Sequence, residues 1–231
     1  MHQKKDKKYK LFFYLFLFIL LSSINNKYFL EKNYSLLKIN EIKINGLSKI
    51  EKAELYKEFK KLFLKNIFFV NQESFEEILN KNNLIEYFYV KKNYPNSIQV
   101  DIKKTKFLAI TNFNKEKYFI GSNGKLIKYN NSQEYEKELP YVFGKIDYPN
   151  FIEFKIIIDK SNFKYENIDS FYYFQNKRWD IKTKKNFLIK LPDKNLLDAL
   201  NIVHELIYSS DFKSDNVIDL RISNHIITSH E

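Results

Sequence analysis

The sequence contains no cysteine, which excludes disulfide scaffolds, thiolate catalysis and zinc sites built on cysteine. Glycine and proline are scarce, with four residues each among 231, so the composition argues against long flexible linkers. The hydrophobic share of 44% and the aromatic share of 17% are too high for a disordered chain. These numbers predict a globular protein with one large domain or two small ones, each with a core of its own.

Arginine is nearly absent although the formal net charge is +11, and Arg178 and Arg221 are the only two. The positive excess is densest near the N-terminus, where five lysines lie within residues 4–10. A nucleic-acid site needs basic residues spread along one face, usually with arginine forks that bind bases or phosphates. The charge distribution therefore predicts no nucleic-acid binding.

One long apolar run follows the lysine cluster. Residues 11–21 are all apolar or aromatic, and sixteen uncharged residues separate Lys10 from Lys27. As a helix they span about 24 Å, whereas the apolar core of a bilayer is about 30 Å thick. We predict a short membrane anchor at 11–30 and a cytoplasmic tail at 1–10, with the remainder exported, because basic flanks stay in the cytoplasm. The alternative is a cleaved signal peptide, for which Ser22 and Ser23 are the only small residues at the exit.

The first module outside the membrane is predicted at residues 31–106. A Ser48-Lys49-Ile50-Glu51 capping box starts a helix, and Pro95 marks a turn between two strands whose apolar residues alternate. The predicted order is strand, helix, helix, strand, strand, with strands at 36–44, 87–91 and 97–103 and helices after Ser48 and at 72–81.

The second module, residues 107–231, has mostly strand patterns. Asn123-Gly124 indicates a tight hairpin, and Asp193 can cap a helix that runs to Tyr208. Residues 150–159 fit a helix and a buried strand equally well. Strands are also predicted at 117–121, 125–129, 168–174, 178–183, 187–191, 217–221 and 225–228.

Fragments that resemble catalytic or cofactor motifs are incomplete. His204-Glu205 begins a zincin motif, but Tyr208 stands where the second zinc ligand is required. The glycine spacing of 121–125 does not fit a phosphate loop, and Leu126 replaces the hydroxyl that binds Mg²⁺. We therefore predict no enzyme, no metal and no cofactor. The remaining alternative is an extracytoplasmic enzyme or solute-binding protein carried on a signal peptide.

Taken together, these segments resemble the FtsQ/DivIB family of cell-division proteins. The first module resembles that family's POTRA domain through its first strand, its Asn66-Ile67-Phe68 turn and the strand pair 90–100, where lysine replaces the usual arginine. The second module is similar at five segments: 121–127, 139–144, 178–180, 189–192 and 218–221. One departure is that Lys103-Lys104-Thr105-Lys106 replaces the acidic-Arg-Pro stretch common after the POTRA domain.

The resemblance implies an α+β protein with an N-terminal transmembrane helix, a POTRA-like β-α-α-β-β domain and a mostly antiparallel β domain with a C-terminal helix and edge strand. It implies a single-pass protein of the inner membrane, at the division septum, that binds the bitopic proteins FtsB and FtsL and catalyses nothing. The partner is expected to add a strand to the open edge of the last strand. That strand is predicted to comprise Arg221, Ile222, Ser223, Asn224, His225, Ile226, Ile227 and Thr228, with Ile222, Asn224, Ile226 and Thr228 on one face. The alternative places the partner elsewhere, near Lys177 and Arg178.

Overall fold

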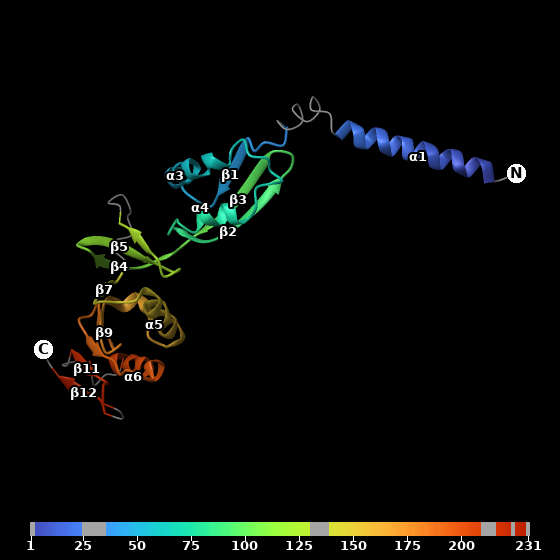
Figure 1. The fold of residues 1–231 in the computed structure, drawn as a ribbon. Helices are drawn as coiled ribbons and strands as arrows, with labels where there is room; N and C mark the ends of the chain where they lie inside the picture. The colour runs from blue at the N-terminus through green and yellow to red at the C-terminus, as the bar shows by residue number, and fades with distance from the viewer. Residues whose placement is uncertain (1–2, 25–35, 130–138, 209–215, 223–224, 230–231) are drawn as a thin grey trace. The chain divides into compact units, whose positions relative to one another are not determined.

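The computed structural model describes the chain apart from residues 1–2, 25–35, 130–138, 209–215, 223–224 and 230–231 (Figure 1). The described parts form two compact units, Met1–Lys104 and Thr105–Glu231. This division lies two residues before the predicted boundary at Lys106. Each unit has its own cluster of buried apolar residues, so each is described separately.

The N-terminal helix α1 spans Gln3–Ile24, and each of the eleven side chains from Leu11 to Leu21 is exposed. Residues 11–24 of the predicted anchor lie in this helix, and residues 25–30 lie outside the described residues. Across the described segments, we find no helix whose length and hydropathy together suffice for crossing a membrane.

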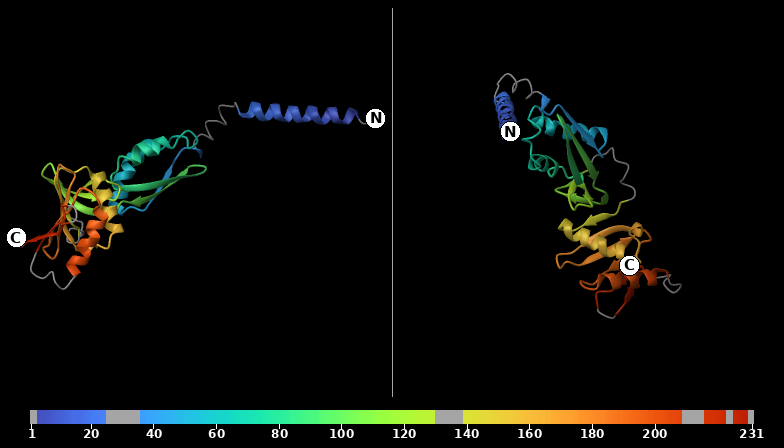
Figure 2. Two further views of the ribbon diagram at one scale, coloured as in Figure 1. Left: turned by 90° about the horizontal axis from the view of Figure 1, so that it is seen from below. Right: turned by 90° about the vertical axis from the view of Figure 1, so that its right-hand side faces the viewer.

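The first unit contains the predicted β-α-α-β-β order. Strand β1 (Glu41–Asn45) pairs in parallel with β3 (Ser97–Lys104), and β3 pairs antiparallel with β2 (Ile85–Asn93), so β3 lies in the centre. Helices α3 (Lys49–Phe59) and α4 (Glu73–Leu79) lie together beside this sheet (Figure 2). Their buried side chains form one core with buried residues of the strands. A short 3₁₀ turn, η1 (Lys60–Leu62), follows α3.

The predicted capping box at the start of α3 is present. The Ser48 Oγ accepts a hydrogen bond from the Glu51 backbone N–H at 3.4 Å, and the Glu51 carboxylate accepts one from the Ser48 N–H at 2.9 Å. Two amides that the helix itself leaves unpaired are thereby satisfied. The side chain of Lys104 also binds this carboxylate, at 2.6 Å. These hydrogen bonds and the lysine outweigh the effect of burial, so the pKa of Glu51 is lowered.

The strand predicted at 36–44 is shorter in the structure. Only residues 41–45 enter the sheet, while Leu37 and Ile39 exchange backbone hydrogen bonds with residues 64–67 instead. Ile39 is fully buried there. Regular alternation of buried and exposed residues begins only at Glu41, which explains the difference.

The second unit is built on one nine-stranded sheet with the order β12-β11-β10-β9-β8-β7-β4-β5-β6. The first strands along the chain are β4 (Phe107–Phe113), β5 (Glu116–Gly121), β6 (Leu126–Lys128), β7 (Tyr141–Phe143) and β8 (Ile168–Tyr173). They are followed by β9 (Trp179–Thr183), β10 (Leu188–Lys190), β11 (Val217–Asp219) and β12 (Ile227–Ser229). Most neighbouring pairs of described strands are antiparallel, as predicted, but β4–β7, β7–β8 and β10–β11 are parallel.

Two helices connect parallel neighbours. Helix α5 (Tyr148–Lys160) connects β7 to β8, and α6 (Leu196–Tyr208) connects β10 to β11. The 3₁₀ turn η3 (Tyr165–Asn167) leads into β8. Both helices contribute to a single core against the sheet and lie on the same side of it (Figure 1). The ambiguous residues 150–159 are therefore helical, because Phe151, Phe154 and Ile158 form the buried stripe.

Candidate partner-binding site

Strand β12 forms one edge of the nine-stranded sheet. It pairs antiparallel with β11, with Ile218 opposite Thr228 and Asp219 opposite Ile227. No other described strand pairs with β12, so its second side faces outward with backbone groups in position to bind another chain. Ile227 is 47% exposed on this strand.

The predicted edge strand is interrupted in the structure. Arg221 and Ile222 leave the sheet after β11, residues 223–224 lie outside the described residues, and His225 and Ile226 precede β12. Ile227 and Thr228 alone of the predicted residues belong to the edge strand, which ends with Ser229. Ile222 and Ile226 therefore do not share a strand face with Thr228, and the predicted position of Asn224 lies outside the described residues.

The carboxylate of Asp219 explains why the strand ends where it does. It accepts a hydrogen bond from the backbone N–H of Arg221 at 3.0 Å, which is an Asx-type turn, and two more from Arg221 Nε at 2.8 and 2.9 Å. The terminal nitrogen Nη2 of the same guanidinium also contacts the carboxylate. The hydrogen bonds from the Arg221 side chain lower the pKa of Asp219 despite its burial, and they raise the pKa of Arg221.

A row of alternating charges crosses the strands next to this edge. Asp180 on β9 lies opposite Lys190 on β10, and Lys190 lies opposite Asp219 on β11. Their chain neighbours Ile189 and Ile218 belong to the core under α5 and α6, so the charged row lies on the other face. Burial raises the pKa of Asp180, and the guanidinium of Arg178 opposes that rise.

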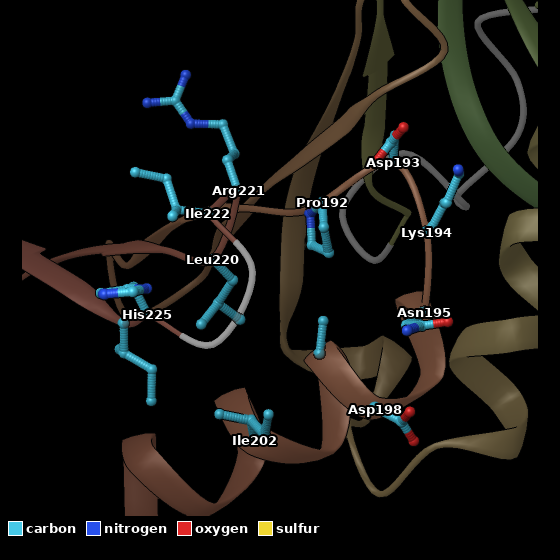
Figure 3. A pocket seen from close by; sticks show the side chains of 12 residues that line it. Pro192, Asp193, Lys194, Asn195, Asp198, Ile202, Leu220, Arg221, Ile222 and His225 are labelled. Carbon is cyan, nitrogen blue, oxygen red and sulfur yellow. The ribbon is translucent and has the colours of Figure 1, made fainter.

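A groove of about 670 Å³ lies between α6 and the connection from β11 to β12 (Figure 3). Leu220 and Ile202 supply apolar surface from opposite walls, and Asp198 and His225 add polar groups. Four of the predicted residues, Arg221, Ile222, His225 and Ile226, line the groove. The remaining lining residues are Pro192, Asp193, Lys194, Asn195 and Ala199.

The wall formed by α6 was not predicted as part of the site. In the sequence, Ile202 could have indicated this wall, because it is apolar but lies outside the inward stripe of the helix. In the structure it is 39% exposed. Its exposure and position give the groove an apolar wall next to a free strand edge. An extended segment with alternating apolar side chains has the shape and chemistry to bind there.

Lys177 and Arg178 are not brought to this edge. They lie in the turn between β8 and β9, and β9 is separated from β12 by three strand spacings, about 14 Å. The Arg178 Nε donates to Asp180 at 3.2 Å, and its guanidinium lies over the ring of Phe174 at 4.4 Å. The structure therefore separates the two predicted contact regions.

We expect Asp219→Asn to destabilise the second unit near neutral pH by weakening the turn at Arg221. Because the folded pKa of Asp219 lies below its unfolded value of about 3.9, its contribution is complete above that value and is lost as the pH falls through the folded pKa. The difference in unfolding free energy between wild type and variant should therefore shrink in acid. Urea titrations at neutral and acidic pH measure it, and a difference independent of pH would contradict this role.

Among the described residues, no group of three side chains has the composition and spacing of a metal site. Residues 121–125, considered as a phosphate loop, form the tight turn between β5 and β6, in which the Gly121 N–H binds the Lys125 carbonyl at 3.0 Å. Gly124 has a φ of +71°, as such a turn requires. This segment is thus a hairpin connection.

Comparison with known proteins gives consistent matches. Residues 37–104 match the model of the POTRA domain, FtsQ-type. The cell division protein FtsQ of Rickettsia felis is 24% identical over 191 residues, which cover 81% of this chain and 70% of the relative. FtsQ of Rickettsia conorii and of Rickettsia bellii match with the same identity and coverage.

A solved structure of the major extracytoplasmic domain of DivIB from Geobacillus stearothermophilus also matches. Its identity is 12% and its TM-score 0.33, over 42% of this chain and 87% of that one. At this TM-score the likeness does not by itself establish a shared fold. The similarity to cell-division proteins therefore rests on the POTRA domain model and on the three FtsQ relatives. The residues that match the domain model, 37–104, contain β1 to β3 of the first unit.

Proposed function

Because this chain belongs to the FtsQ/DivIB family of cell-division proteins and has a role in cell division, we propose that it is a non-enzymatic scaffold of the division assembly. It binds small bitopic proteins like FtsB and FtsL outside the cytoplasm and so links early and late division proteins at the septum. The open edge of β12 beside the groove carries this proposal.

Binding at β12 requires both the edge and the groove. The strand has three residues, so an added strand gains only a few backbone hydrogen bonds, each with a net value of about 0.5–1.5 kcal/mol. Apolar side chains buried against Ile202, Leu220 and Ile226 add about 25 cal/mol for each Å² removed from water. We infer that the partner is an extended segment whose apolar residues enter the groove while its backbone pairs with β12.

Proline substitution tests the edge directly. Successive N–H groups of a strand point to opposite sides, so the N–H of Thr228 points away from those of Ile227 and Ser229. Proline should lower the melting temperature where the N–H binds β11. Where the N–H faces outward, proline should weaken partner binding at least about tenfold with little change in melting temperature.

Alanine variants at the same three positions are the matched controls, because they keep the N–H while removing the side chain. Each variant is purified at full length in detergent together with tagged partner, and both the melting temperature and the amount of partner retained are measured. Undiminished partner binding in all three proline variants would rule out strand addition at β12.

We further propose that the predicted anchor at residues 11–30, of which α1 contains residues 11–24, holds the chain in the inner membrane. Eleven consecutive exposed apolar or aromatic side chains, from Leu11 to Leu21, support it, because apolar surface on this scale is unfavourable in water. The lysines within residues 4–10 favour a cytoplasmic N-terminus and an exported C-terminus.

A reporter fused after Glu231 tests this topology. A reporter that works only outside the cytoplasm should be active, whereas a strictly cytoplasmic reporter at the same position should be inactive. Replacing the lysines at 4, 5, 7, 8 and 10 with serine should reduce the preference for a cytoplasmic N-terminus, because these charges set the orientation of the helix. Activity of the cytoplasmic reporter in the wild-type fusion would contradict the topology.

A further inference from the structure

Several large apolar side chains are exposed together at one end of the first unit, which we call the aromatic end. It comprises Leu36, Leu64, Phe68, Phe69 and Tyr94, of which Phe69 is the most exposed at 81%. The rings of Phe68 and Tyr94 stack at 4.9 Å, which joins the loop after α3 to the turn between β2 and β3. None of these five side chains belongs to the buried core.

Backbone hydrogen bonds hold the same segments together. Leu64 N–H binds the Ile39 carbonyl at 3.0 Å, and Ile67 N–H binds the Leu37 carbonyl at 2.9 Å. Asn40 N–H binds the Asn96 carbonyl at 3.0 Å. The aromatic end is therefore a fixed surface, and it contains residue 36, the first described residue after α1.

The charge at the aromatic end is mainly positive, although Glu41 lies opposite Ser97 in the sheet and Glu58 pairs with Lys61 at 3.7 Å. Segments 36–40, 60–70 and 91–97, which form it, contain no aspartate or glutamate. They contain six lysines: Lys38, Lys60, Lys61, Lys65, Lys91 and Lys92. Aromatic rings among lysines with long apolar stems are the combination that binds at the headgroup level of a bilayer, where anionic lipids attract the ammonium groups.

The chain length between α1 and this surface keeps the two close. Eleven residues separate Ile24 from Leu36, and even a fully extended chain of that length reaches only about 40 Å. A helix inserted in the bilayer would therefore hold the aromatic end near the membrane surface. Such tethering makes weak contacts sufficient, since the effective concentration at short linker lengths is in the millimolar range.

We propose that the aromatic end docks on the outer surface of a bilayer that contains anionic lipid. Phe69 and its aromatic neighbours enter the interface, and the surrounding lysines bind lipid headgroups. This orients the first unit on the membrane. The inference rests on the proposed anchoring through α1.

The absence of cysteine allows a clean test in the full chain, because a single introduced thiol can be labelled alone. Phe69→Cys carries an environment-sensitive fluorophore at the aromatic end. Ile50→Cys is the matched control, because Ile50 is also apolar and 76% exposed but lies at the start of α3, away from the docking segments. Both proteins are placed in nanodiscs of phosphatidylcholine with phosphatidylglycerol, or of phosphatidylcholine alone, and quenched with nitroxide-bearing lipid.

We expect the label at position 69 to be quenched at least about twofold more strongly than the label at position 50, and more strongly in anionic discs than in neutral ones. Lys38→Glu with Lys65→Glu should reduce the quenching at position 69. Equal quenching at the two positions overturns the proposal. So does a label at position 69 that is shielded from water but not quenched by lipid, since that result indicates a protein occupant.

Gel filtration without detergent distinguishes a failure of the docking from a failure of the membrane anchor. A chain that elutes apart from the discs contradicts anchoring by α1 and the docking with it. A chain that stays with the discs but shows no difference between the two labels contradicts the docking alone.

Discussion

Phe154→Ala is expected to destabilise the second unit by about 3–5 kcal/mol, the usual cost of removing a buried phenylalanine. Phe154 is 2% exposed on α5, and its ring stacks on Trp179 at 4.7 Å with an angle of 12° between the planes. It also meets Phe171 edge to face at 5.9 Å. The variant leaves a cavity between helix and sheet that rigid aromatic neighbours cannot fill.

The fluorescence of Trp179 measures this loss directly, because it is the only tryptophan and lies in the affected core. Denaturant titration of wild type and variant gives the difference in unfolding free energy. Phe113→Ala is the control in the same unit, since Phe113 is 47% exposed and its removal should cost less than about 1 kcal/mol. A loss below that value at Phe154 would contradict the described packing.

Gly46→Ala should destabilise the first unit by at least about 3 kcal/mol, because two penalties combine. The φ of Gly46 is +89°, which a residue with a Cβ adopts only at a cost. An added Cβ would also lie 1.7 Å from the carbonyl oxygen of Ile102, in the central strand β3. The backbone of the sheet would have to move.

Gly124→Ala separates the two penalties. Gly124 also has a positive φ, of +71°, but the nearest atom to an added Cβ there is 3.8 Å away, in the side chain of Ile152. Only the backbone cost of about 1 kcal/mol is expected. Circular dichroism follows the unfolding of Gly46→Ala and tryptophan fluorescence follows that of Gly124→Ala. Similar losses of unfolding free energy in the two variants would show that the close approach to Ile102 adds no cost of its own.

The first unit was predictable because its signals are local. The Ser48–Glu51 box defines a helix start within four residues, and the alternation of Ile98, Val100 and Ile102 defines a strand and its buried face. The match to the FtsQ-type POTRA model over residues 37–104 agrees with that order.

The sequence of α5 fits a helix and a strand equally well for a physical reason. Ile152, Ile156 and Ile157 suggested either structure, yet Ile156 is exposed and the other two are only partly buried. Phe151, Phe154 and Ile158 carry the helical period instead. Aromatic residues favour strands by propensity, so burial against Trp179 decides the outcome here.

The candidate site was only partly predictable because its geometry depends on pairing between distant segments. Strand β11 pairs in parallel with β10 through the crossover that contains α6, and only then does β12 return to form the edge. The Asp219–Arg221 turn breaks the predicted strand, and a side-chain hydrogen bond of this kind leaves no periodic signal. The groove wall formed by α6 follows from the same crossover.

Hydrogen exchange at β12, measured on the full-length protein with and without a bitopic partner, tests the proposed strand addition most directly. We expect the partner to slow exchange of outward-facing amides within residues 227–229, because an added strand accepts their hydrogen bonds. Unchanged exchange at β12, together with slower exchange at Lys177 and Arg178, would contradict binding at the sheet edge and place the partner at the turn between β8 and β9.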